Sequence, residues 1–234
     1  MLTRGRWAFL IALALAWSQA SAALIITDAD IAADHYVYDL TFAEMASDAV
    51  FDADVWARSN VDLFPEPSSW GGARYVRAER GFSVASFTYL FDFSNTTYRP
   101  VHMDLRDYLA MFCNQDHNED TVITTAWSTD GTNYNTIQVL ASPVYPTQGV
   151  DQAGSANAVL AGLPATVYYR VTMENSDANG FSLVQNQWNR QRPPSGDARH
   201  FRVDFTTAQV PEPATLSLVA LGGLGLLGRR RRDG

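Results

Sequence analysis

The densest group of polar side chains in the sequence lies at residues 114–120, Asn-Gln-Asp-His-Asn-Glu-Asp, between two segments with strand character. Carboxylate and amide oxygens at short spacing suit Ca²⁺, which takes six to eight oxygen ligands. The run lacks the glycine that an EF-hand loop needs at its sixth position, so it does not belong to that class of site. Two interpretations stay open, a solvated structural loop and a calcium site. The ligands of such a site would be Asp116, Asn118, Glu119 and Asp120.

A second group combines an aromatic ring with arginines at Trp188, Arg190 and Arg192, beside a proline-rich stretch at 191–197. Indole rings offer an apolar face on which a sugar can stack, and guanidinium groups donate charge-assisted hydrogen bonds to carboxylates. We predict that these residues are exposed and contact a polysaccharide, with solvated surface charge as the alternative. Aromatic side chains dominate sandwich interiors, so the core is the expected place for the other tryptophans of the exported region, Trp56, Trp70 and Trp127.

The common catalytic signatures are missing from the sequence. It has no HExxH zinc motif and no GxSxG nucleophile elbow. The abundant carboxylates leave one enzyme class open, a surface glycoside hydrolase-like enzyme whose acid pair is brought together by folding. We predict a non-catalytic protein without a cofactor other than the candidate Ca²⁺, and the hydrolase is the alternative. The four histidines are scattered along the chain, at His35, His102, His117 and His200.

Charge and cysteine content narrow the class of partner. Residues 23–228 hold 11 basic and 24 acidic residues and therefore carry a formal charge of −13. Such a surface repels nucleic acid, so we expect no nucleic-acid partner. The chain has one cysteine, Cys113, so it forms no intrachain disulfide.

The elements that must position these residues read as strands. Apolar and polar residues alternate along 166–173, 101–106 and 201–206, and four aromatic residues of 87–93 share one face. A period of two is typical of strands with one buried face. Further strands are expected at 35–42, 50–57, 72–78, 121–128, 135–141 and 180–188, a short helix at 43–49 and a long loop at 142–157.

About nine to eleven short strands at this spacing predict an all-β fold, an antiparallel β-sandwich or jelly roll over residues 23–205. The pair Asp130-Gly131 between two of these strands is a strong hairpin signal. The surrounding segment Trp-Ser-x-Asp-Gly-x-Asn-Tyr at 127–134 resembles a strand–turn–strand unit of galactose-binding-like and discoidin-like sandwiches.

The N-terminus has the organisation of a secretory signal peptide. Arg4 and Arg6 precede an almost wholly apolar stretch at 7–17, and the small residues at 20–22 offer a cleavage site. We predict a signal peptide at 1–22 that directs the chain to the Sec export machinery as an N-terminal signal helix.

The C-terminus combines a proline-bounded tripeptide, an apolar segment and an arginine run. Residues 206–213 are expected to form a linker, 214–228 a short transmembrane helix, and 229–234 a cytoplasmic tail. At about 1.5 Å per residue, the helix covers roughly three quarters of a ~30 Å hydrocarbon core. The positive-inside rule places the arginines in the cytosol. They are Arg229, Arg230, Arg231 and Arg232.

The order of these three parts, beginning with Val210, Pro211, Glu212 and Pro213, resembles the PEP-CTERM sorting signal of Gram-negative bacteria. The resemblance implies recognition by an exosortase, a membrane-embedded cysteine transpeptidase, and cleavage close to the tripeptide. It further implies that the exported body is held at the inner membrane before processing. The body is then expected at the cell surface or in an exopolysaccharide matrix.

Overall fold

The computed structural model describes residues 23–40, 48–65, 74–78, 83–112, 122–141, 149–174 and 201–210. These residues form twelve strands, one α-helix and one short 3-10 helix. The all-β prediction is confirmed. The predicted signal helix at 1–22 and membrane helix at 214–228 lie outside the described residues, and no helix within those residues is long and apolar enough to cross a membrane.

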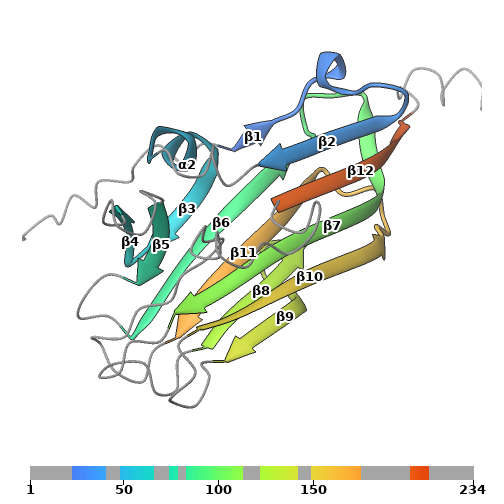
Figure 1. Cartoon of the computed structure of the whole chain (residues 1–234). Coiled ribbons are helices and arrows are strands. Elements are labelled where there is room, and N and C mark those ends of the chain that lie inside the picture. Colours follow the sequence, from blue (N-terminus) through green and yellow to red (C-terminus); the bar gives the residue numbers. More distant parts are fainter. Residues whose placement is uncertain are drawn as a thin grey trace, which may run out of the picture.

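Two sheets pack face to face (Figure 1). The six-stranded sheet has the order β1-β6-β11-β8-β9, and β3 pairs with the same edge of β6 as β1 does. Its pairs are antiparallel except for β1 with β6. Its strands are β1 (Leu24–Ile25), β3 (Val55–Ser59), β6 (Val84–Asp92), β8 (Val122–Ser128), β9 (Asn135–Ala141) and β11 (Thr166–Glu174).

The four-stranded sheet has the order β10-β7-β12-β2 and is antiparallel throughout. A separate antiparallel pair is formed by β4 (Val61–Pro65) and β5 (Arg74–Ala78). The strands of the four-stranded sheet are β2 (His35–Leu40), β7 (Tyr98–Phe112), β10 (Gly149–Val159) and β12 (Phe201–Gln209).

Aromatic side chains from both sheets make the core. The four aromatics of 87–93 are buried, as the alternation predicts. Phe91 of β6 meets Phe205 of β12 at a ring-centroid distance of 5.2 Å, and Tyr89 meets Phe201 at 5.1 Å. Burial of each large apolar side chain contributes about 1.5–3 kcal/mol, so this aromatic layer is a main source of the sandwich's stability.

The prediction of a strand at 50–57 is wrong in its first half. Residues Asp48–Asp54 form helix α2, and β3 begins only at Val55. Phe51 and Val55, four positions apart, are both buried. A spacing of four positions puts two residues on one face in a helix and in a strand alike, so this buried pair does not distinguish the two from sequence. Residues 43–47 of the helix expected at 43–49 lie outside the described residues, and residues 48 and 49 belong to α2.

Two further boundaries differ from expectation. Strand β10 (Gly149–Val159) occupies much of the loop expected at 142–157, because it pairs along its length with β7. Strand β12 continues to Gln209, four residues into the expected linker at 206–213, because it follows β7 as far as Tyr98. The strand expected at 180–188 lies outside the described residues.

Candidate binding surfaces

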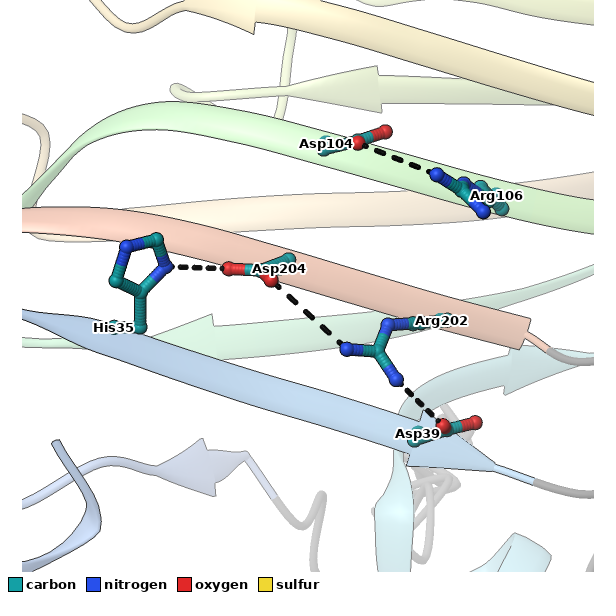
Figure 2. Close-up of polar contacts among 6 residues, drawn as sticks. All are labelled: His35, Asp39, Asp104, Arg106, Arg202 and Asp204. Carbon is teal, nitrogen blue, oxygen red and sulfur yellow. Dashed lines mark hydrogen bonds and ion pairs between the residues drawn. The ribbon is translucent and has the colours of Figure 1, made fainter. Parts of the chain in front are cut away.

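The outer face of the four-stranded sheet carries charged residues that pair with one another (Figure 2). Arg202 of β12 donates to Asp39 of β2 at 2.9 Å and lies 4.0 Å from Asp204. Arg202 and Asp39 are cross-strand partners in the register, so the strand pairing itself places the two charges together. We call this surface, with His35, Asp104 and Arg106, the charged face.

The other two contacts of the charged face do not join cross-strand partners, because His35 is paired with Thr206 and both Asp104 and Arg106 lie on β7. His35 Nδ1 lies 2.9 Å from Asp204 Oδ1, and Arg106 lies 3.8 Å from Asp104 (Figure 2). Asp104 and Asp204 are cross-strand partners, so the two carboxylates lie on neighbouring strands at the same level of the sheet. Each of them has a cationic or imidazole neighbour, and the pair lies on an outer sheet face. Exposed pairs of this kind contribute roughly 0–1 kcal/mol each.

The outer face of the six-stranded sheet carries an aromatic group instead. Trp56 of β3 and Tyr168 of β11 meet edge-on, with ring centroids 5.6 Å apart and an interplanar angle of 69°. The Arg170 guanidinium carbon lies 3.6 Å from the centroid of the Tyr134 ring. All four side chains are partly exposed. We call Trp56, Tyr134, Tyr168 and Arg170 the aromatic corner.

The β8–β9 hairpin positions Tyr134. The Asp130 carboxylate accepts hydrogen bonds from the backbone N–H groups of Asn133 at 2.7 Å and Thr132 at 2.8 Å, and from the Asn133 and Ser128 side chains. The hydrogen bonds from Asn133, followed by that from Thr132, hold the pKa of Asp130 well below its usual range. The Asp-Gly hairpin prediction is thus confirmed.

Glycine is needed at position 131, directly after Asp130, for two reasons. Gly131 has φ of 69°, in the left-handed region, and a Cβ there would lie 3.2 Å from the Tyr168 ring. The hairpin therefore packs directly beneath the Tyr168 side of the aromatic corner.

A third polar group lies inside the sandwich. Asp107 of β7 accepts from Gln138 Nε2 at 2.6 Å and from the Tyr169 hydroxyl at 2.9 Å. A Cβ on Gly154 of β10 would lie 2.3 Å from Asp107 Oδ1, so the backbone of β10 covers this pair closely. Burial raises the pKa of the Asp107 carboxyl, and its hydrogen bonds oppose that shift only in part. We call Asp107, Gln138 and Tyr169 the buried cluster.

The C-terminal end of β12 lies against the N-terminal segment. The Val210 N–H donates to the Thr97 carbonyl at 2.8 Å. The Asp28 carboxylate in turn accepts from the Thr97 N–H at 2.8 Å and from the Thr96 hydroxyl. These bonds, that from Thr96 first, lower the pKa of Asp28. The segment following the predicted signal peptide and the start of the predicted sorting tail therefore contact the same loop.

Comparison with known families identifies the tail. Residues 209–232 match the family model described as the PEP-CTERM protein-sorting motif. The chain carries a PEP-CTERM sorting motif. The motif marks the chain as an exported, sorted protein that is processed at its C-terminus. The PEP-CTERM match begins at Gln209, the last residue of β12, so no linker of appreciable length separates the motif from the sandwich.

The solved structures that match the chain have low sequence identity to it. A carbohydrate-binding module of Cellvibrio mixtus lichenase 5A is 10% identical over 71% of this chain and 95% of its own, with a TM-score of 0.37. A xylan-binding domain from Paenibacillus barcinonensis is 11% identical over 74% and 95%, with a TM-score of 0.38. The tailspike protein 4 of bacteriophage CBA120 is 8% identical, and the match covers 73% of this chain but 19% of the tailspike chain, with a TM-score of 0.33. No curated protein matches the chain.

Most residues singled out in the sequence lie outside the described ranges. Within those ranges, no group of three or more acidic, histidine or cysteine side chains is placed to hold a metal ion. The sequence predicts Trp56 in the core, but its side chain is partly exposed. Tyr168 and Arg170 occupy the outward-facing positions of the alternating segment at 166–173. This alternation is the sequence pattern from which part of the aromatic corner could have been predicted. Outside the described residues are Trp188, Arg190, Arg192, Asp116, Asn118, Glu119, Asp120, Pro211, Glu212, Pro213 and Arg229 to Arg232.

Proposed function

We propose that this chain is an exosortase substrate whose β-sandwich is displayed at the cell surface, where it associates with matrix polysaccharide without catalysing a reaction. The observation that carries the proposal is the PEP-CTERM motif beginning at the last residue of β12. In this arrangement the signal peptide at 1–22 directs Sec export, and the helix at 214–228 holds the precursor in the inner membrane. The arginines at 229–232 stay in the cytosol until cleavage near 211–213.

The aromatic corner supports the polysaccharide part of the proposal. Trp56 and Tyr168 present partly exposed aromatic surface beside a guanidinium group. Rings with an apolar face and a polar edge are suited to surfaces that bind polar ligands with apolar faces, as sugars are. The side chains come from β3, β11 and the β8–β9 hairpin, all fixed by sheet pairing, so the surface is held in place before any ligand arrives.

The alternative, a glycoside hydrolase-like enzyme, would use the carboxylate pair Asp104 and Asp204. That pair lies on an outer sheet face among the ion pairs of the charged face. Release of reducing ends from polysaccharide by the purified protein, lost in Asp104→Asn, would favour the hydrolase over the binding function.

The sorting function is tested by the double substitution Glu212→Ala with Pro213→Ala. Proline favours an extended backbone, and an extended segment suits binding in the cleft of a processing enzyme. We expect the variant to accumulate as membrane-held precursor that keeps its C-terminal tail. Immunoblotting of membrane and released fractions, with mass spectrometry of the mature C-terminus, measures this outcome.

The chain supplies a matched control, because a second Pro-Glu-Pro tripeptide stands at 65–67 without an apolar segment after it. The same double substitution there, Glu66→Ala with Pro67→Ala, should leave processing intact. Normal processing of the 212–213 variant would reject recognition through the tripeptide.

A further inference from the structure

We propose that the aromatic corner binds a carboxylated sugar and that Arg170 recognises its carboxylate. The inference rests on the proposed polysaccharide association and narrows its ligand from sugars in general to acidic ones. It assigns the cation of the site to one residue, and the stacking surface to Trp56 and Tyr168.

Arg170 differs from the other described arginines in the contacts that its side chain makes. Of the five arginines whose side chains the structure describes, four pair with a carboxylate or with backbone carbonyls of this chain. Arg170 differs, because among the described residues it forms no ion pair, and its one specific contact is the Tyr134 ring. A cation–π contact uses the charge of a guanidinium but none of its five N–H donors. The other four are Arg58 with Asp52, Arg106 with Asp104, Arg202 with Asp39, and Arg99 with the carbonyls of Phe93, Thr96 and Tyr98.

Arg170 is positioned on β11 next to the aromatic side chain of Tyr168. Tyr168 and Arg170 are two residues apart on β11, so they share its outer face at a separation of roughly 6.6 Å. Trp56 meets Tyr168 at 69°, which forms a corner rather than a flat strip. A sugar ring on Tyr168 then directs its carboxylate to the Arg170 fork, which matches carboxylate geometry bidentately.

The acidic groups of the chain limit which anionic ligands can reach Arg170. The nearest acidic group of the hairpin, Asp130, already accepts four hydrogen bonds and does not compete for Arg170. The body as a whole carries −13 over residues 23–228 and repels anions at long range. At physiological salt this repulsion is screened beyond about 8 Å. The ligand that fits both facts is an acidic sugar flanked by neutral ones, not a polymer charged at every residue.

The test compares two forms of one polymer, the exopolysaccharide of the producing bacterium before and after chemical reduction of its carboxyl groups. Co-sedimentation or calorimetry with the mature protein should show about tenfold or tighter binding of the native form, since a hydrogen bond to a charged group is among the stronger ones. Arg170→Gln should lower binding of the native form to the level of the reduced form. Arg106→Gln, a matched change on the opposite outer face, should keep the preference, and both variants should unfold at the wild-type temperature.

Equal binding of the two polymer forms by the wild-type protein, or an unchanged preference in Arg170→Gln, would overturn the assignment to an acidic sugar while leaving polysaccharide association standing. Tighter binding of polygalacturonate at low salt than of the native exopolysaccharide would overturn the sparse-charge part. Loss of both polymers in Trp56→Ala supports the stacking role. Failure of the wild-type protein to bind either polymer would instead reject the proposed function itself.

Discussion

Strand β11 places two neighbouring tyrosines in opposite environments. Tyr169 is fully buried and donates to Asp107 in the buried cluster, whereas Tyr168 points outward and meets Trp56 in the aromatic corner. Successive side chains of a strand point to opposite faces, so one strand serves both regions. The two regions contain similar groups, tyrosine beside a charged residue, and differ in what those groups have left to bind.

In the buried cluster the fold uses the polar groups of Asp107 and Tyr169 and the Gln138 amide N–H, whereas Gln138 Oε1 has no partner among the described residues. Both oxygens of Asp107 accept hydrogen bonds within the sandwich, and β10 covers the group. In the aromatic corner the Arg170 donors are not used on the described residues, and the rings are partly exposed. The inner region therefore contributes to stability, and the outer one is the surface that we propose for binding. Substitutions in the first should change unfolding, and those in the second should change ligand affinity alone.

The largest expected effect on stability is that of Gly154→Val. A Cβ at this position would lie 2.3 Å from Asp107 Oδ1 and 2.5 Å from the Gln138 amide, so both side chains must move and their hydrogen bond breaks. Overpacking together with the loss of a buried charged hydrogen bond costs about 3 kcal/mol or more. Urea unfolding followed by circular dichroism measures the loss as a lower midpoint.

The matched control is Ser155→Val, one residue further along β10 with an exposed side chain. Its effect should stay within about 0.5 kcal/mol. Similar midpoints for the two variants would mean that β10 does not seal the buried cluster, and the contrast between inner and outer regions would lose its basis.

Strands β10, β11 and β12 show where prediction from the sequence succeeds and where it fails. Clean alternation at 166–173 and 201–206 predicts β11 and β12 because large apolar residues occupy one face. In β10 the inward positions hold Gly154, Ala156 and Ala158. These residues are small because they lie against bulky neighbours, and small residues give an apolar pattern too weak to distinguish a strand from a loop.

The candidate surfaces depend on longer-range pairing. The sequence indicates that Tyr168 and Arg170 share an outward face and that Asp130-Gly131 makes a hairpin. It does not show that Tyr134 reaches Arg170, because these residues are 36 apart in sequence and their contact depends on the pairing of β8 with β11. Trp56 is likewise brought to Tyr168 only through the pairing of β3 with β6. Local patterns predict faces, whereas sheet order decides which faces meet.

A smaller effect separates the two tyrosines directly. Tyr169→Phe removes the hydrogen bond that the hydroxyl donates to Asp107 Oδ2, a buried bond to a carboxyl group, at a cost of about 1–3 kcal/mol. Tyr168→Phe keeps the ring in the aromatic corner and should change stability by less than about 0.5 kcal/mol. Thermal and urea unfolding of the pair measure the difference. Equal losses in the two variants would contradict the assignment of structure to one face and binding to the other.

The smallest effect is a difference in pH dependence between an inner and an outer carboxylate. Burial raises the pKa of Asp107 above its ordinary value of 3.8. The folded state therefore keeps a proton that the unfolded chain has released, and this group's contribution to stability falls as pH rises from about 3.8 through the raised pKa, by about 1.4 kcal/mol per pH unit at most. Asp107→Asn should remove that fall, because an amide does not titrate in this pH range. The free Gln138 Oε1 can accept from the new amide after a flip.

Asp130 in the hairpin provides the opposite sign. Its hydrogen bonds with Asn133 and Thr132 lower its pKa, so its stabilising contribution is complete above about 3.8 and is lost as pH falls below that value. Unfolding midpoints of Asp107→Asn and Asp130→Asn, each taken relative to wild type between pH 3 and 7, should therefore diverge in opposite directions. Slopes of the same sign would mean that Asp107 is not desolvated by β10, and its environment would then be no different from that of the outer face.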